Sequence, residues 1–188
     1  CIRDSDAGAA SIGPYVAGGS TLILKTNPSG SGVAERLIID SNGRTLFSRG
    51  GLTSSRNVGT KTGEIQVANS ENSAAISILA YSNSVAGPHL MFGKTRSTNS
   101  TGNTIVQDGD RLGEIGFCGN DGTDLDPFGA AIKCHVDGTP SANTMPGHLA
   151  FYTTDSGSTS TERLRITPTG AFYINCLLYT SPSPRDRG

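Results

Sequence analysis

Three aspartates in the segment NDGTDLD bring oxygen ligands close together along the chain. Asp121, Asp124 and Asp126 lie within this one short stretch, and carboxylate oxygens are ligands that Ca²⁺ prefers in proteins. Their spacing does not match an EF-hand loop, and Asp-Gly pairs are common turn formers. We favour an ordinary turn and keep calcium as the alternative, with no other metal ligands and no cofactor expected.

A separate pair of carboxylates, Asp108 and Asp110, has the chemistry of the acid and base of a glycosidase. Nothing in the sequence places the two across a sugar-sized groove, and the chain contains no Trp to serve as a sugar platform. The GxSxG, P-loop and HExxH signatures are also missing from the sequence. We therefore expect no catalytic residues and no enzymatic activity.

The histidines and cysteines show none of the spacings typical of a metal or redox site. His89, His135 and His148 fall on polar strand faces or beside turns, so we expect them at the surface. Cys118 and Cys134 lack a CxxC spacing. We expect both to be free thiols rather than the two halves of a disulfide.

The elements that carry these residues are predicted to be short β-strands. Gly accounts for 25 of 188 residues, hydrophobic residues make up 35%, and turn residues interrupt the chain at short intervals. This composition is typical of an all-β protein. The net charge of −1 is spread without a basic stripe, which argues against nucleic-acid binding. No apolar run is long enough for a transmembrane helix, so no membrane insertion is expected.

Alternation of apolar with polar or small residues marks the individual strands. Ile115 and Phe117 share a face in LGEIGFCG, as do Ile132 and Cys134 in AAIKCHVD. The same period of two predicts strands in GEIQVA, AAISILAY, PHLMFGK and GHLAFYTT, at residues 63–68, 74–81, 88–94 and 147–154. A neighbouring chain is expected to approach closely at the strand glycines, which are Gly113, Gly116 and Gly119.

An internal repeat links two distant parts of the sequence. Residues 22–43 (LILKTNPSGSGVAERLIIDSNG) align without gaps to residues 149–170 (LAFYTTDSGSTSTERLRITPTG), at a constant offset of 127 positions, 149 minus 22. Each copy predicts a strand, a Ser/Gly turn, a second strand, a Gly turn and a third strand. In Glu35-Arg36 and Glu162-Arg163 the two side chains point to opposite faces, so each must bond to another strand or subunit.

The most specific stretch, residues 109–170, follows a defined order of motifs. It runs as GDxLGxIxFxGxDG, then an Ala-rich strand ending in DGTP, then PGxLxFxT, ERxRI and a Gly turn. This order resembles a module of bacteriophage tail-fibre and tail-spike proteins. Cys118 departs from it at a position expected to be polar, and Leu164 stands where Met is more usual. The resemblance is carried by Gly109, Asp110, Leu112, Gly113, Ile115, Phe117, Gly119, Asp121, Gly122, Asp137 to Pro140, Pro146, Gly147, Leu149, Phe151, Thr153, Glu162, Arg163, Arg165, Ile166 and Gly170.

The resemblance implies a fold, a partner and a role. It implies short, Gly-rich antiparallel sheets in an elongated homotrimeric fibre, whose assembly closes sheet edges that one copy leaves open. The implied role is virion structure and host attachment, through a surface glycan or an outer-membrane protein, after assembly in the bacterial cytoplasm. An intramolecular chaperone domain commonly follows the ERxRI motif in such proteins. A glycan-depolymerising tail spike and a bacterial or prophage surface adhesin built on the same module remain the alternatives.

Both ends of the chain resemble the translation of a sequencing adapter. CIRDS at the start and CLLYTSPSPRDRG at the end can be back-translated to sequences that resemble the same adapter on opposite strands. We therefore expect residues 1–5 and 176–188 to be adapter-derived, against the alternative of a Pro/Ser tail that binds a partner. The chain between them is expected to divide into a partial fibre repeat, 6–72, and the tail-fibre module, 73–175.

Overall fold

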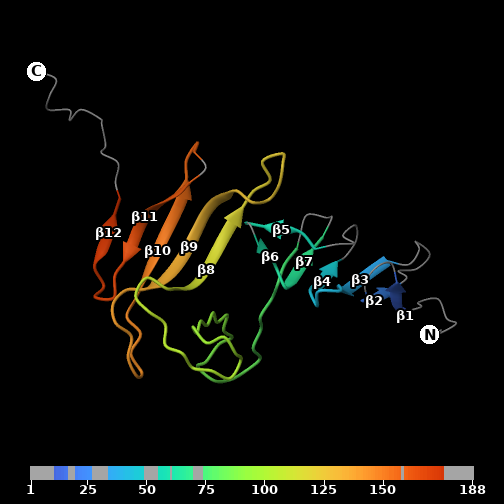
Figure 1. The fold of residues 1–188 in the computed structure, drawn as a ribbon, viewed down its shortest axis with the longest axis horizontal. Helices are drawn as coiled ribbons and strands as arrows, with labels where there is room; N and C mark the ends of the chain where they lie inside the picture. Colours follow the sequence, from blue (N-terminus) through green and yellow to red (C-terminus); the bar gives the residue numbers. More distant parts are fainter. Residues whose placement is uncertain are drawn as a thin grey trace, which may run out of the picture. The chain divides into compact units, whose positions relative to one another are not determined.

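All regular elements in the described part of the chain are β-strands, as the composition predicts (Figure 1). The described part of the chain contains no helix, and hence none that is long and apolar enough to cross a membrane. The adapter-like segments 1–5 and 176–188 lie outside the described residues. A computed structural model of the chain describes residues 11–16, 20–26, 34–48, 55–59, 61–69, 74–157 and 159–175.

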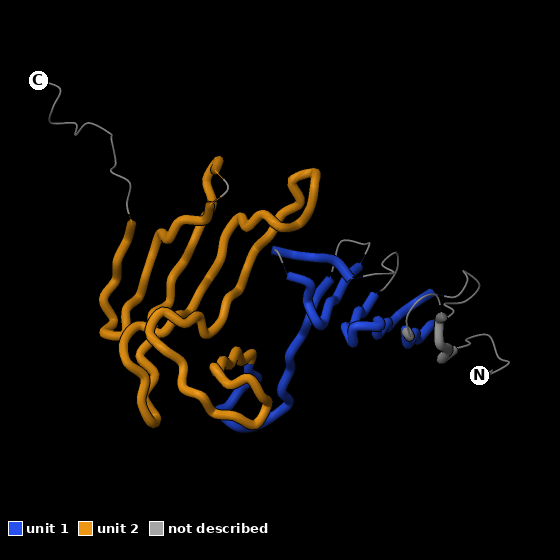
Figure 2. The backbone as a smooth tube through the Cα atoms, viewed as in Figure 1, with its two compact units in different colours: residues 1–89 blue, residues 90–188 orange. Residues whose placement is uncertain are grey.

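The chain divides into two compact units, Cys1–His89 and Leu90–Gly188 (Figure 2). The first unit contains a five-stranded sheet in the order β1-β2-β3-β4-β7. Its first four strands are antiparallel, whereas β7 runs parallel to β4 and therefore needs a crossover connection, a departure from the all-antiparallel expectation. The strands are β1 (Ser11–Val16), β2 (Ser20–Thr26), β3 (Ala34–Ile39), β4 (Thr45–Ser48) and β7 (Ile65–Ala68).

The crossover between β4 and β7 contains a short hairpin that the sequence pattern does not predict. Its strands, β5 (Asn57–Val58) and β6 (Lys61–Thr62), are antiparallel and form a sheet of their own. Two-residue strands are too short to show an alternation of apolar and polar residues, which is the signal that finds strands in a sequence.

The second unit contains a fully antiparallel five-stranded sheet in the order β12-β11-β10-β9-β8. Each strand pairs with the next one in the sequence, so β8 and β12 form the two edges of the sheet (Figure 1). The strands predicted in LGEIGFCG, AAIKCHVD and GHLAFYTT are confirmed. The elements are β8 (Arg111–Cys118), β9 (Phe128–Val136), β10 (Gly147–Thr154), β11 (Ser160–Ile166) and β12 (Phe172–Ile174).

The strands predicted at residues 74–81 and 88–94 are wrong. No strand or helix is present from residue 74 to residue 94, and Ile76 and Met91 are 73% and 83% exposed. Alternation makes a segment compatible with a sheet, but a strand also needs a second strand to complete its hydrogen bonds. No such neighbour accompanies this segment among the described residues of a single copy.

The internal repeat is confirmed down to the register of its strands. The pairing of Leu22 with Ile39 in the β2–β3 ladder becomes, 127 positions later, the pairing of Leu149 with Ile166 in the β10–β11 ladder. The shift of register between Leu24 and Lys25 recurs between Phe151 and Tyr152. The third strands, β4 and β12, pair with equivalent residues as well.

A glycine turn closes the second hairpin of each copy. Gly43 and Gly170 have φ values of +81° and +82°, a left-handed conformation that other residues adopt only at a cost. In each copy the glycine amide donates a hydrogen bond to the carbonyl oxygen three residues earlier, that of Asp40 or Thr167. The sequence repeat is therefore a repeat of one β-meander.

Candidate functional site

One face of the β8–β12 sheet is apolar and largely open. Strand pairing puts its side chains side by side, and Phe172 and Ile174 remain 67% and 72% exposed. Open apolar areas of this kind mark interaction sites on proteins. We call this surface the apolar face; its residues are Ile115, Phe117, Ile132, Cys134, Leu149, Phe151, Leu164, Ile166, Phe172 and Ile174.

Two of the motif glycines make room for aromatic rings of the same chain. A Cβ added at Gly113 would lie 2.9 Å from the Cβ of Phe92, and one added at Gly116 would lie 2.5 Å from the ring of Phe128. Gly119 has open space instead. The close approach expected at these glycines is therefore made at two of them by side chains within the unit, where we expected a neighbouring chain.

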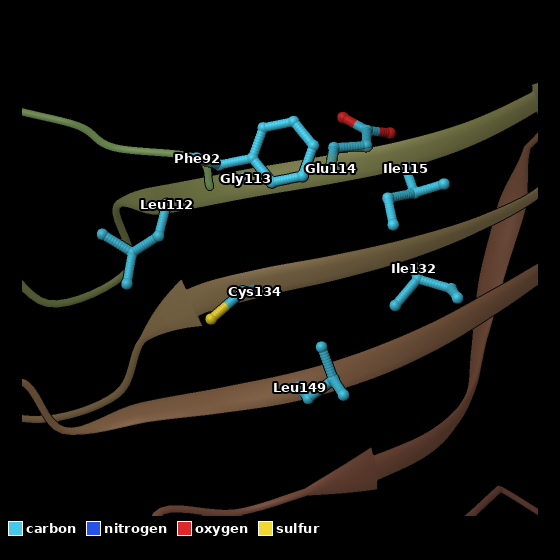
Figure 3. A pocket seen from close by; sticks show the side chains of 8 residues that line it. All are labelled: Phe92, Leu112, Gly113, Glu114, Ile115, Ile132, Cys134 and Leu149. Atoms are coloured by element: carbon cyan, nitrogen blue, oxygen red, sulfur yellow. The ribbon is translucent and has the colours of Figure 1, made fainter. Parts of the chain in front are cut away.

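A cavity of about 270 Å³ opens on the apolar face beside Phe92 (Figure 3). The Phe92 ring lies over β8 at Gly113, and the floor is formed by side chains from β9 and β10 (Figure 3). The lining is almost wholly apolar, so the cavity suits an apolar side chain better than a sugar or an ion. It is lined by Phe92, Leu112, Gly113, Glu114, Ile115, Ile132, Cys134 and Leu149.

The opposite face of the same sheet carries a network of charged and polar side chains. Glu114 on β8 forms ion pairs with Arg111 and with Lys133 on β9, the latter at 3.5 Å. The Nζ atom of Lys133 also lies 4.6 Å from the centre of the Tyr152 ring on β10, which is a cation–π contact. We call this surface the charged face.

The network continues onto β11 through Glu162. The Tyr152 hydroxyl donates to Glu162 at 3.1 Å, and Arg165 donates to both Glu162 oxygens at 2.8 and 2.7 Å. These bonds from Arg165 lower the pKa of Glu162, while burial and the nearby carboxylate raise the pKa of Tyr152. Arg163 donates instead to Thr153 on the neighbouring strand, at 3.0 Å. The adjacent Glu162 and Arg163 thus bond across to β10 as their alternation predicts.

Two histidines stack at the end of the charged face. His135 on β9 and His148 on β10 are register partners, with ring centres 5.3 Å apart and planes 26° from parallel. His148 is only 8% exposed, and its Nδ1 atom lies 3.2 Å from a carboxylate oxygen of Asp137. Burial, followed by the nearby His148, lowers the pKa of His135. The surface position expected for His148 is wrong because direct cross-strand pairing stacks it on His135, whereas His89 is exposed.

Asp108 and Asp110, which directly precede β8, accept hydrogen bonds from neighbouring segments of the second unit. Asp108 accepts a hydrogen bond from the Gly138 amide at 2.8 Å. Asp110 accepts from Arg96 through both carboxylate oxygens, at 2.7 and 2.9 Å, and from the Gln107 amide at 2.9 Å. The Arg96 guanidinium holds the pKa of Asp110 far below its usual range. A glycosidase acid needs a raised pKa, so Asp110 has the opposite electrostatic environment.

The aspartates of NDGTDLD bond to the backbone of their own loop. Asp121 accepts from the amides of Thr123 and Asp124 at 2.8 and 3.1 Å, and Asp124 accepts from the amide of Asp126 at 2.9 Å. The bonds from Thr123 and Asp124 lower the pKa of Asp121. Within the described residues, no three His, Cys, Asp or Glu side chains are arranged to hold a metal ion. These bonds are those of an Asx turn.

The two strand cysteines lie at different points of the β8–β9 ladder. Cys134 is paired with Gly113 on the apolar face, and Cys118 is paired with Phe128. Both are free thiols. Burial, followed by the nearby carboxylates of Asp126 and Glu114, raises the pKa of Cys118, so this thiol stays protonated.

Sequence reasoning missed two residues that complete the motif. Phe92 fills the space over Gly113, and Arg96 neutralises Asp110, yet both precede the motif in the sequence. A glycine within a strand signals close approach by another group, and a half-buried aspartate signals a nearby cation. Neither signal says which residue supplies the partner.

The fold of the chain matches that of solved phage tail-fibre structures. No protein-family model matches the sequence, and no curated protein matches it. The carboxy-terminal domain of the bacteriophage T5 L-shaped tail fibre superposes with a TM-score of 0.68 at 15% identity, over 95% of this chain and 76% of that one. The same domain with its intra-molecular chaperone domain gives 0.70 at 15% identity, over 95% of this chain and about half, 52%, of that one. At this identity the likeness shows the fold alone: the chain has the all-β fold of a phage tail-fibre domain.

Proposed function

We propose that the chain is a structural part of a phage tail fibre, a virion component that assembles as a homotrimer. The observation that carries this proposal is the two-sidedness of the β8–β12 sheet, in a fold shared with the T5 tail-fibre domain. One face bonds its own charged side chains to one another, and the other leaves large apolar side chains open. Three copies around a common axis would turn their apolar faces inward and their charged faces outward.

The hydrophobic effect favours burial of the apolar face against a partner over its exposure to water. Removing apolar surface from water contributes roughly 25 cal/mol per Å², so residues such as Phe117, Phe172 and Ile174 gain most from a partner because they are more than half exposed. The charged face needs no partner, since its carboxylates already accept bonds from Arg and Lys. The arrangement thus favours association through one face.

We further propose that the fibre binds a host-surface glycan or an outer-membrane protein and catalyses no reaction. Three copies would present each outer surface three times, which raises avidity without any new contact. The non-catalytic part of the proposal is supported by the aspartates most like a glycosidase pair, because Asp108 and Asp110 bond to the backbone and to Arg96.

Light scattering tests the assembly. The 188-residue chain is expected to have three times its 19.4 kDa mass in solution. Ile174→Glu places a charge on the apolar face and is expected to lower that mass, whereas Tyr173→Glu is the matched control. Tyr173 is the adjacent residue, is also mostly exposed at 63%, and points to the opposite face. A chain that is monomeric at high concentration, or a loss of assembly in both variants, would contradict the proposal.

Binding to bacterial surfaces tests the role. The chain is expected to bind one of a panel of immobilised lipopolysaccharides, capsular glycans or outer-membrane extracts, and more tightly than Ile174→Glu because assembly multiplies its sites. The same mixtures are assayed for new reducing sugar ends. Release of reducing ends would support the glycan-cleaving tail spike in its place.

A further inference from the structure

A second apolar surface lies in the segment that precedes β8, residues 74–93, which we call the arm. From Asn72 to Gly93 the sequence contains no Asp, Glu, Lys or Arg. The arm alternates like a strand at Ile76 and Ile78, yet it forms no strand. Its large apolar side chains are all exposed, and they are Ile76, Ile78, Leu79, Tyr81, Val85, Leu90, Met91 and Phe92.

The exposed area of the arm is large enough to build an interface. With roughly 150 Å² for a fully exposed large apolar side chain, the low end of the aromatic range, the eight side chains expose about 900 Å². The open residues of the apolar face add about 400 Å² on the same basis. The arm of one copy and the apolar face of another therefore offer about 1,300 Å² together, within the roughly 1,200–2,000 Å² of total surface that a stable interface buries.

The arm ends on the apolar face. Its penultimate residue, Phe92, packs against Gly113, and the cavity of about 270 Å³ lies beside its ring (Figure 3). The next residues back along the chain, Leu90 and Met91, are 69% and 83% exposed. A second copy that covers the apolar face must therefore also meet Leu90, Met91 and Phe92, the part of the arm that belongs to the same unit as that face.

We propose that the arm of one copy packs in an extended conformation on the apolar face of a second copy and places an apolar side chain in the cavity beside Cys134. The occupant is a second copy because both surfaces are apolar, both belong to this chain in equal number, and their joint area fits a stable interface. This inference rests on the proposed self-assembly and goes beyond it, since faces could meet without exchanging arms. It explains why residues 74–81 carry a strand pattern without a strand partner.

Cross-linking between copies tests the exchange, because Cys134 lies in the cavity floor. One chain carries Ile78→Cys with Cys134→Ser, and a second, differently tagged chain keeps Cys134. Cys1, Cys118 and Cys176 are replaced by Ser in both. The two chains are co-expressed and oxidised, and a disulfide-linked pair carrying both tags is measured on a non-reducing gel. Such a pair forms only between copies.

The neighbouring residue provides the matched control. Strand alternation places Ser77 on the side opposite Ile76 and Ile78. We expect Ile76→Cys or Ile78→Cys to yield roughly ten-fold more of the doubly tagged pair than Ser77→Cys, because alternate side chains leave the interface. Equal yields at the three positions would overturn the extended packing of the arm.

A measurement without substitutions separates this inference from the proposed assembly. Hydrogen exchange of the unmodified chain is followed by mass spectrometry at several concentrations, together with light scattering. Slower exchange in residues 74–81 as the oligomer forms supports the exchange of arms. If the protein forms an oligomer but the amide hydrogens of residues 74–81 exchange as fast as in the dilute protein, the arm inference is overturned and self-assembly still stands. A chain that remains monomeric throughout overturns both.

Discussion

The two copies of the β-meander, β2-β3-β4 and β10-β11-β12, share one backbone and differ in one face. The common face is apolar in both, with Leu22, Leu37 and Ile39 equivalent to Leu149, Leu164 and Ile166. On the other face, the first copy places Ile23, Ile38 and Leu46 in register as a buried core, joined by Ala68. The second copy places Ala150, Arg165 and Tyr173 at the same positions.

The difference shows that the register of the strands and the polarity of the second face are specified by different residues. In each copy, Arg36 or Arg163 lies at the shift of register and donates to Thr26 or Thr153, at 2.8 and 3.0 Å. Identical residues of the two copies lie at the register shift, at the glycine turn and on the apolar face. On the other face Glu35 and Glu162 are also identical, but the paired residues Ile23, Ile38 and Leu46 of the first copy are replaced by Ala150, Arg165 and Tyr173. Keeping the bulge and the turn is enough to keep the meander.

The largest effect is expected when a residue of the buried face in the first copy is replaced by its counterpart in the second copy. Ile38→Arg puts a charge where the native residue is 5% exposed, and it should cost about 3–5 kcal/mol because the charge has no buried partner. Arg165→Ile should cost less than about 1 kcal/mol because the Arg165–Glu162 pair is partly exposed. Urea unfolding followed by hydrogen exchange of each unit measures both. Equal costs would show that the two faces are equally tolerant.

Substitution of the turn glycines tests the similarity of the two copies, because the loss of stability should be equal at both turns. Gly43→Ala and Gly170→Ala should each destabilise their unit by about 1–2 kcal/mol, since each requires a left-handed residue. An added Cβ meets nothing within 4 Å at either site, so the cost is purely conformational. Gly119→Ala is the control, because it is equally open without a positive φ. A cost at Gly119 matching the other two would exclude the conformational explanation.

The bond at the register shift should have a smaller, matched effect. Thr26→Val and Thr153→Val each remove the hydroxyl that accepts from an Arg Nε atom. Each should cost about 0.5–1 kcal/mol, the net contribution of one hydrogen bond. Thr→Ser at either position keeps the acceptor and serves as the control. Chemical denaturation measures the loss of stability of each variant. A loss in only one copy would show that the Arg–Thr hydrogen bond stabilises only that copy.

The smallest expected effect is a difference between the two units in their loss of stability at acid pH. The pKa of His135 is lowered in the folded protein, so the unfolded chain binds more protons as the pH drops below about 6.5. The stability is therefore complete above that pH and is lost as the pH falls through the folded-state pKa. The second unit should lose protection from hydrogen exchange between pH 7.5 and 5.5 more than the first. His135→Gln should remove the difference, and His89→Gln should not.

The parts of the fold found from sequence are those with local signals. Alternation locates β8, β9 and β10 because each strand has one face of apolar residues. The 127-position repeat predicts three strands per copy, and register pairing confirms them. Alternation over residues 74–81 predicts a strand that is not formed. The pattern shows only that the segment is compatible with a strand, whereas strand formation also requires a neighbouring strand to pair with.

The candidate site was less accessible to sequence reasoning because its partners come from distant positions. Phe92 over Gly113 and Arg96 on Asp110 are contacts between groups 21 and 14 residues apart, the differences of their numbers. The sequence predicts a surface position for His148 because the residue falls on a polar strand face beside a turn, although cross-strand stacking on His135 buries it. Such contacts depend on strand register.

The sequence by itself determined the class of fold, the strand-turn-strand order of both meanders and the positions of their glycine turns, because these follow from backbone preferences and the period of two. Only the tertiary structure decided that one face of the second sheet is a bonded charged network while the other stays open and apolar. Register sets which side chains become neighbours across strands, and a shift by one residue would exchange the two faces.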